Sequence, residues 1–351
     1  MKILLQLILC CMLISCEKRQ PDAVADTPDP AAFLLSVDIS SYPEIADTHP
    51  RFFDEHGKEG DFLTLLKQNG INTIRLRLWV NPAEGHCGFG EVREFSKIVR
   101  LSGFRLWLSL HYSDSWADPS RQETPREWQH LKYNTLKDTV FHYTQRVIRE
   151  IKPDYIQIGN EINDGFLHPV GKLSDHPGQL TGLLDTAIHA VRTENRDIRI
   201  ILHYAGLSGA EWFYDQMDRL DYDMIGLSFY PVWHGKSLSA LRDTMEKLGA
   251  RCRKAVLIAE TAYPFTLGWN DQTHNVVGLE EQLILPDYPA TPEGQQQFIR
   301  QIIDMAGDVP EGAGMCYWGA ELIAWKGYQS AEGSPWRSEE HTSELQSPNT
   351  I

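Results

Sequence analysis

The feature that most constrains the fold is an alternation of short apolar runs with longer segments of helical period. The runs are rich in β-branched and aromatic residues, as strands are, and they cover residues 33–40, 72–80, 104–113, 154–161, 197–205, 223–231, 254–261 and 312–319. In segments between them, apolar residues recur at steps of three or four, as they do after Leu136, Leu180 and Phe298. This alternation predicts right-handed βαβ units and a parallel sheet.

Eight such strands are the number that closes a parallel barrel, so the predicted fold is an α/β (β/α)8 TIM barrel. A doubly wound open sheet is the alternative, but no glycine-rich phosphate loop follows the first strand. The chain has 351 residues, of which 42 % are hydrophobic, and this is ample for one large core. We expect a single barrel domain over residues 32–336.

The first sixteen residues are expected to be a signal peptide. Lys2 precedes an apolar run from Ile3 to Ile14 that is too short for a permanent membrane span. The residues Leu13-Ile14-Ser15-Cys16 that close this segment are similar to a bacterial lipobox, which predicts cleavage before Cys16 and a lipid on its thiol. A plain secretory signal is the alternative. Residues 17–31 are polar and proline-rich, as in a flexible tether. We therefore expect an exported lipoprotein with an outer-membrane anchor, on the periplasmic or the cell-surface face.

The last residues are expected to be foreign to the domain. The run RSEEHTSELQS, which begins at Arg337, matches the translation of a common sequencing adapter. We interpret residues 337–351 as an artefact tail and expect the barrel to lack its last outer helix. The cysteines that remain after the signal, Cys87, Cys252 and Cys316, have no disulfide or metal-ligand spacing.

The charge of the chain excludes one class of partner and favours another. The formal net charge is -15 and no basic stripe occurs, which argues against nucleic acid. Ten Trp and thirteen Tyr suit a neutral sugar that stacks on aromatic faces, although many of these rings are expected in the core. We expect a polysaccharide partner and a monomer.

Two carboxylates stand where a barrel keeps its chemistry, at the carboxyl ends of strands. Glu161 ends the fourth predicted strand, next to Asn160, and Glu260 ends the seventh. Opposite strands face each other across the mouth, so the two side chains can flank one glycosidic bond. A retaining hydrolase needs such a pair about 5–5.5 Å apart, with one member protonated and the other ionised. Either glutamate alone would be better explained as a surface carboxylate, but the pair favours glycoside hydrolysis.

Long motifs in a fixed order then identify a family. They are VDISSYPEI (37–45), GINTIRLRLWVNP (70–82), HYSDSWADPSRQ (111–122), QIGNEINDG (157–165), IGLSFYPVWHG (225–235), AETAYP (259–264), TPEGQ (291–295) and Tyr317-Trp318. With them the chain resembles glycoside hydrolase family 53, the arabinogalactan endo-β-1,4-galactanases of clan A. The resemblance implies retaining endo-hydrolysis of type I (arabino)galactan, with Glu161 as the acid/base and Glu260 as the nucleophile.

Further side chains are expected to support this chemistry. Arg75 and Arg77 share one face of the second strand, and an inward arginine needs an anion, most simply Glu260. For one of the two, outward packing among the helices stays open. Asn160 is expected to bind the sugar 2-hydroxyl, and Tyr230 is similar to the clan's tyrosine that contacts the nucleophile. The remaining expected subsite residues are His111, Asp114, Trp116, Asp118, Trp233, His234 and Trp318, although a loop aspartate is often only a turn or a cap.

The implied reaction needs no cofactor. Family members with a long loop between strands seven and eight can hold a structural Ca2+, and residues 268–278 offer Asp271 and Asn275. Two oxygens are too few for calcium alone, so these two residues are named only as candidate ligands and a structural Ca2+ stays open. The alternative functions are another clan A endo-β-glycanase, acting on glucan or mannan, and a non-catalytic glycan-binding lipoprotein.

Overall fold

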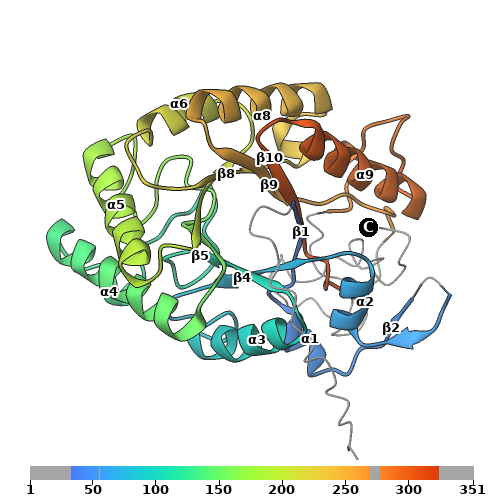
Figure 1. Cartoon of the computed structure of the whole chain (residues 1–351), viewed down its shortest axis with the longest axis horizontal. Helices are drawn as coiled ribbons and strands as arrows, with labels where there is room; N and C mark the ends of the chain where they lie inside the picture. The colour runs from blue at the N-terminus through green and yellow to red at the C-terminus, as the bar shows by residue number, and fades with distance from the viewer. Residues whose placement is uncertain (1–32, 55, 269–276, 324–351) are drawn as a thin grey trace, which may run out of the picture. The chain divides into compact units, whose positions relative to one another are not determined.

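The protein folds as the predicted (β/α)8 barrel. The computed structural model describes residues 33–54, 56–268 and 277–323. Eight parallel strands close into a barrel in the order β1-β10-β9-β8-β7-β6-β5-β4, with β4 paired to β1 (Figure 1). The strands are β1 (Leu34–Asp38), β4 (Thr73–Leu78), β5 (Arg105–Leu110), β6 (Tyr155–Ile158), β7 (Arg199–Ala205), β8 (Met224–Ser228), β9 (Ala255–Thr261) and β10 (Gly312–Trp318). Each one lies inside a run that the sequence predicted as a strand.

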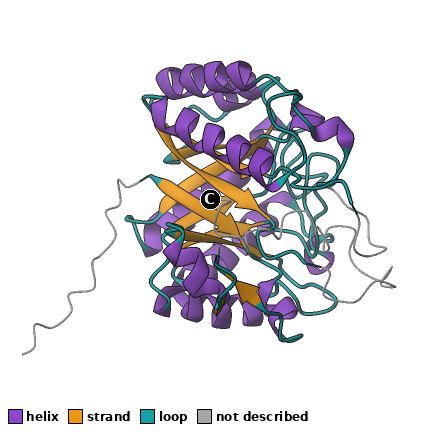
Figure 2. Ribbon diagram, turned by 90° about the vertical axis from the view of Figure 1, so that its right-hand side faces the viewer, coloured by secondary structure: helices purple, strands orange, loops and turns teal. Residues whose placement is uncertain are grey.

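Helices surround this sheet, and the loops at the carboxyl ends of the strands gather on one side of it (Figure 2). The helices are α1 (Tyr42–Ala46), α2 (Phe62–Gln68), α3 (Phe89–Leu101), α4 (Tyr133–Ile151), α5 (Pro177–Glu194), α6 (Ala210–Gln216), α7 (Pro231–His234), α8 (Leu238–Cys252) and α9 (Pro292–Asp308). The described residues also form short 3-10 helices at Arg126–Trp128 and Glu280–Gln282, and β2 (Phe52–Phe53) pairs with β3 (Glu59–Gly60).

Local sequence explains where the outer helices begin and which side they bury. Thr291 caps α9 by accepting a hydrogen bond from the Gly294 amide, and Pro292 occupies the first turn. In α4, Leu136, Val140 and Ile151 recur at helical spacing and are fully buried. Burying such a side chain stabilises the fold by about 1.5–3 kcal/mol, so the apolar stripe holds each helix against the sheet.

The core has two layers, because successive side chains of a strand point to opposite faces. The larger cluster lies between strands and helices. The smaller cluster comes from the alternate strand positions that face inward: Leu34, Trp107, Tyr155, Ile201, Met224, Leu257, Ala259 and Cys316. The Arg75 guanidinium lies over the Trp107 ring, 5.4 Å from its centroid. Apolar residues therefore fill the inside of the barrel and form a floor beneath the polar residues at its mouth.

Several sequence predictions concern residues outside the described ranges. These are the signal peptide with Cys16, the tether, the tail at 337–351 with the missing outer helix, and the candidate calcium ligands Asp271 and Asn275. Among the described residues, no helix is both long enough and apolar enough to cross a bilayer.

Candidate active site

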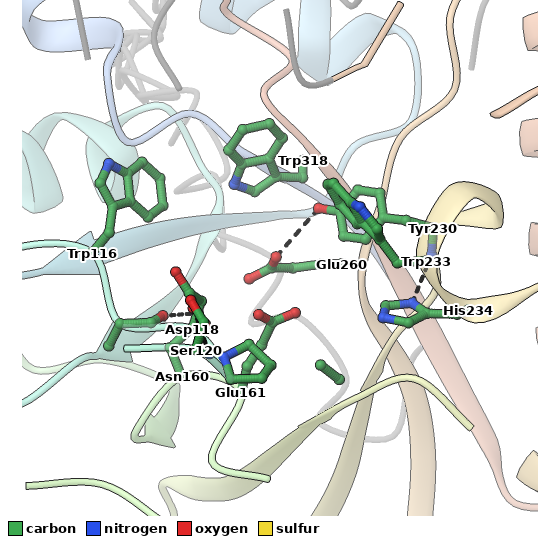
Figure 3. Close-up of a pocket in the computed structure, with 13 residues that line it drawn as sticks. Trp116, Asp118, Ser120, Asn160, Glu161, Tyr230, Trp233, His234, Glu260 and Trp318 are labelled. Carbon is green, nitrogen blue, oxygen red and sulfur yellow. Dashed lines mark hydrogen bonds between the residues drawn. The ribbon is translucent and has the colours of Figure 1, made fainter. Parts of the chain in front are cut away.

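A cavity of about 420 Å³ lies at the carboxyl ends of the strands, and Glu161 and Glu260 both line it (Figure 3). The two glutamates come from opposite sides of the mouth, after β6 and within β9, and their carboxyl groups point toward each other in Figure 3. The other residues that line the cavity are Trp116, Ala117, Asp118, Pro119, Ser120, Asn160, Ala205, Tyr230, Trp233, His234 and Trp318. The cavity therefore combines a pair of carboxylates with aromatic walls, as a site for sugar hydrolysis does.

A strained turn holds Glu161 in place. The backbone of Glu161 is left-handed, with φ 49°, which is costly for a residue with a side chain. Two residues earlier, Gly159 has φ 75°, and a Cβ there would lie only 2.4 Å from the Ile162 side chain. The chain can thus turn sharply at the end of β6 only because a glycine stands there, and the turn directs the Glu161 side chain into the cavity.

Glu260 is held by a cation and a hydroxyl. Nη2 of Arg75 lies 2.7 Å from Oε1 of Glu260, and the Tyr230 hydroxyl donates to Oε2 at 3.2 Å. Nη1 of the same guanidinium contacts Oδ2 of Asp38, also at 2.7 Å. Arg75 is 1 % exposed, so one buried cation serves two carboxylates. Burial alone would lower the pKa of Arg75, but the Glu260 and Asp38 carboxylates outweigh this effect and hold the pKa above its usual value. The side chain therefore stays charged.

The two glutamates differ in electrostatic surroundings. Burial first, and then the nearby Glu260 carboxylate, raise the pKa of Glu161 to about 8. Burial also raises the pKa of Glu260, but the Arg75 guanidinium and the Tyr230 hydroxyl oppose that rise. Arg75 contacts Glu260 directly, so the first proton to enter the pair binds Glu161. The contacts therefore favour a carboxylic acid at Glu161 and a carboxylate at Glu260.

Asn160 links the two halves of the site. Its amide nitrogen donates to the Ala117 carbonyl, and its Oδ1 accepts from Nη2 of Arg75, both at 2.9 Å. Gln157 also donates to this Oδ1. Asn160 therefore lines the cavity in a fixed orientation, at the place where the sequence led us to expect a contact with the sugar.

Arg77 does not share the role of Arg75. Within the described residues it forms no ion pair, and its guanidinium lies 3.8 Å from the Trp116 ring centroid and 4.7 Å from that of Trp79. Nη2 of Arg77 approaches Sγ of Cys87 at 3.2 Å. The predicted pairing with Glu260 thus applies only to Arg75, and Arg77 supports the aromatic wall.

The loop after β5 carries four predicted subsite residues, of which two line the cavity and two do not. Trp116 and Asp118 line the cavity, and Oδ1 of Asp118 also caps the turn at Ser120. His111 is buried behind the wall, where its Nδ1 accepts from the Ala117 amide. Asp114 caps backbone amides of Asn81 and Arg126 and does not line the cavity.

Aromatic residues from β8, β10 and their loops complete the walls. Trp233 is 54 % exposed at the rim, whereas Trp318 is buried beside Glu260 (Figure 3). His234 accepts the Tyr230 amide on its Nδ1 at 3.0 Å, and burial lowers its pKa to about 4. All three rings line the cavity, and their role as sugar platforms stays a prediction.

Ser228 and Gln157 carried no sequence prediction, whereas the sequence placed His203 among the polar residues at the carboxyl ends of strands. Ser228 donates to Oε1 of Glu161, and Nε2 of His203 lies 2.9 Å from the Ser228 hydroxyl. Gln157 lies beneath, in contact with both Arg75 and His203. Their only sequence signal is a polar residue on the inward face of an apolar strand. In the described ranges, no cluster of three or more His, Cys, Asp or Glu side chains is arranged to hold a metal.

Comparisons with known proteins agree with this geometry. The chain is 39 % identical to an uncharacterised Niallia circulans protein of the bgaB 5′ region, over 82 % of this chain and 83 % of that one. It is 31 % identical to the arabinogalactan endo-β-1,4-galactanase of Cellvibrio japonicus, over 84 % and 83 %. The solved family 53 catalytic domain of Ignisphaera aggregans superposes with a TM-score of 0.81 at 35 % identity, over 91 % of this chain and 96 % of that one. The model of glycosyl hydrolase family 53 matches residues 34–347, and the chain belongs to that family.

Proposed function

We propose that this protein is an arabinogalactan endo-β-1,4-galactanase, which cleaves internal bonds of type I galactan and retains the anomeric configuration. The observation that carries the proposal is the pair of buried glutamates, which face one cavity and of which only Glu260 is paired with a buried cation. Family membership makes the chain a glycoside hydrolase, and the galactanase name of its Cellvibrio japonicus relative supports galactan as the substrate.

In the first step, Glu260 attacks the anomeric carbon and Glu161 gives its proton to the departing glycosidic oxygen. Arg75 and Tyr230 keep the attacking carboxylate ionised and oriented. The neutral state of Glu161 near pH 7 is what a general acid requires. The products of this step are a glycosyl ester on Glu260, a shortened galactan chain and a Glu161 carboxylate.

In the second step, a water molecule replaces the departed chain. Glu161, now a carboxylate, accepts a proton from that water, whose oxygen attacks the anomeric carbon and releases Glu260. Two inversions give net retention. Because carboxyl groups and water account for every bond made and broken, we propose that the reaction needs no cofactor.

A digest tests the proposal. The purified protein is incubated with β-1,4-galactan, β-1,4-glucan and β-1,4-mannan, and the products are followed by chromatography and by proton NMR. We expect galactan alone to yield oligosaccharides, with the β anomer forming first. Turnover of glucan or mannan instead would favour a different clan A glycanase. Binding of galactan without turnover would favour a glycan-binding protein.

We also propose that the protein is an exported monomer anchored through Cys16, with its lipid in the outer membrane. The support is the lipobox-like end of the apolar N-terminal run. Metabolic labelling with a fatty acid should label the wild-type chain and leave Cys16→Ser unlabelled. An unlabelled wild type would favour simple secretion. Light scattering of the purified protein measures its oligomeric state.

A further inference from the structure

A row of buried polar side chains connects the partner of the nucleophile with the acid/base residue. We name Gln157, His203 and Ser228 the hydrogen-bond relay; they come from β6, β7 and β8, and each is fully buried. The relay begins at Arg75, which contacts Glu260, and ends at Glu161. Each hydrogen bond has a donor and an acceptor, and the donor at every link of the relay is determined by its neighbours.

The first member is oriented by Arg75. Oε1 of Gln157 accepts from Nη2 of Arg75 at 3.0 Å and from its Nε at 3.3 Å. A guanidinium can only donate, so this end of the amide must be the oxygen. The amide nitrogen then faces the other way and lies 3.0 Å from Nδ1 of His203. It also lies 2.9 Å from the Gly159 carbonyl and from Oδ1 of Asn160.

The second member takes one tautomer. Nδ1 of His203 lies 3.4 Å from the backbone amide nitrogen of Glu161, which must donate and for which no other acceptor occurs among the described residues. Nδ1 must therefore carry no hydrogen, although Oδ1 of Asn160 lies 3.2 Å away. That oxygen already accepts from Arg75 and Gln157. Burial and the Arg75 charge hold the pKa of His203 well below 6.5, so the ring is neutral and its hydrogen is on Nε2.

The third member, Ser228, accepts a hydrogen bond from His203 and donates one to Glu161. Nε2–H of His203 donates to the Ser228 oxygen at 2.9 Å, so the hydroxyl hydrogen of Ser228 must point elsewhere. It points to Oε1 of Glu161, which lies 2.5 Å from the serine oxygen. Oε1 is thus an acceptor both when Glu161 is ionised and when it is neutral. The acid proton is left with Oε2, the other oxygen of a carboxyl group that points into the cavity (Figure 3).

We propose that the relay fixes the proton of Glu161 on Oε2, which makes Ser228 a positioning residue for the acid step. The inference rests on the proposed role of Glu161 as acid/base. In the step itself, the Oε2 proton moves to the glycosidic oxygen, which keeps the electron pair of the broken bond to the anomeric carbon. Ser228 continues to donate to Oε1 and stabilises the carboxylate that remains. Without Ser228, the proton is free to occupy either oxygen and the carboxyl group is free to turn.

The test replaces Ser228 with alanine. Galactan turnover by Ser228→Ala should fall about 10- to 100-fold, the factor expected for one lost hydrogen bond to a charged group. Aryl β-galactobiosides with a very acidic phenol need no proton on the leaving oxygen, so their glycosylation rate should change less than threefold. The matched control is Ser36→Ala: Ser36 is a fully buried serine on β1 whose hydroxyl has no partner among the described residues. This control should match the wild type on both substrates.

The pH profile separates positioning from a packing defect. Ser228 lowers the pKa of Glu161 by donating to its carboxylate, against the rise caused by burial, Glu260 and Asp118. The other charge that acts on Glu161 is Arg75, and both nearby histidines, His203 and His234, are neutral at pH 7. The alkaline limb of kcat/KM should therefore move to higher pH in Ser228→Ala. Equal losses on galactan and aryl substrates with an unmoved limb would overturn the inference, as would wild-type turnover of galactan.

The double variant Glu161→Ala with Ser228→Ala distinguishes an error in the role given to Ser228 from an error in the proposed function. If Ser228 acts only through Glu161, adding Ser228→Ala to Glu161→Ala should leave aryl-substrate rates unchanged. A further loss in the double variant would show that Ser228 acts elsewhere and would overturn the inference. If instead Glu161→Ala itself keeps wild-type activity on galactan, the proposed acid/base assignment fails. Thermal melts of each variant confirm that the compared proteins are folded.

Discussion

Nη2 of Arg75 lies 2.7 Å from Oε1 of Glu260, and both side chains are almost completely removed from water. The same guanidinium pairs with Asp38 and donates to Gln157 and Asn160. A buried ion pair adds little net stability but is costly to break, because the partner is left as an unpaired buried charge. Arg75 is therefore best understood as the group that keeps Glu260 ionised in a low-dielectric site.

Removal of this cation should affect both stability and activity. Arg75→Met leaves two buried carboxylates unpaired, so we expect the free energy of unfolding to fall by about 3–5 kcal/mol and kcat on galactan to fall at least 100-fold. The matched control is Arg51→Met, which breaks an exposed pair with Glu59 and should leave the free energy of unfolding nearly unchanged. Urea unfolding and initial rates measure the two quantities. A stable and active Arg75→Met protein would contradict this role.

The acid/base assignment predicts a characteristic kinetic pattern. Glu161→Ala should lose galactan hydrolysis by a factor of about 100 to 10,000, the contribution of general acid catalysis. Aryl galactobiosides with good leaving groups should still glycosylate Glu260, and added azide should attack the resulting ester and restore turnover. The product would be a β-galactobiosyl azide, which mass spectrometry and NMR can identify. Glu123→Ala, which removes an exposed carboxylate, is the control. Unchanged galactan turnover in Glu161→Ala would remove this residue from the mechanism.

A second buried acid predicts how stability depends on pH. Oε1 of Glu321 accepts the Ser41 amide at 2.7 Å, and Oε2 has no partner among the described residues. Burial and then the nearby Asp38 carboxylate raise the pKa of Glu321 to about 8 from the usual 4.5. The folded state therefore favours the protonated acid, and unfolding releases its proton between these pH values. The stability contributed by the neutral form is complete below pH 4.5 and is lost as pH rises through 8.

Glutamine imitates the neutral acid at every pH. Glu321→Gln should thus melt like the wild type near pH 4.5 and at a higher temperature than the wild type at pH 8.5. Melts recorded by circular dichroism over this range provide the measurement. The control is Glu59→Gln, at an exposed carboxylate whose pKa its hydrogen bond from Arg51 lowers; this variant should not gain stability at alkaline pH. If Glu321→Gln lowers the melting temperature at pH 8.5, the side chain is needed as a carboxylate.

The sequence predicted the barrel and the places of its two glutamates because both depend on local patterns. An apolar run indicates a strand, and the first polar side chain after the run marks the end of that strand. Glu161 and Glu260 could therefore be assigned to opposite sides of one mouth. The partner of Arg77 could not be predicted, since Trp116 lies on a loop whose path is set by tertiary contacts. Ser228 left no signal because one serine in an apolar strand is common. Asp114 looked like Asp118 in sequence, and only the loop geometry separates the cap from the cavity residue.

The stacking of Arg77 on Trp116 yields a prediction about substrate binding. The guanidinium lies close to the rings of both Trp79 and Trp116, and Trp116 lines the cavity. A buried cation–π contact is worth about 0.5–2 kcal/mol, and Arg77→Met keeps most of the volume while removing the charge. We expect KM for galactan to rise about 2- to 10-fold with kcat nearly unchanged, because Arg77 contacts neither glutamate.

The control is Arg105→Met. Arg105 is another buried arginine over an aromatic ring, that of Tyr155, and it does not line the cavity. It should lower the melting temperature without changing KM. A loss of kcat at constant KM in Arg77→Met would show that Arg77 acts on the reacting groups and not through Trp116.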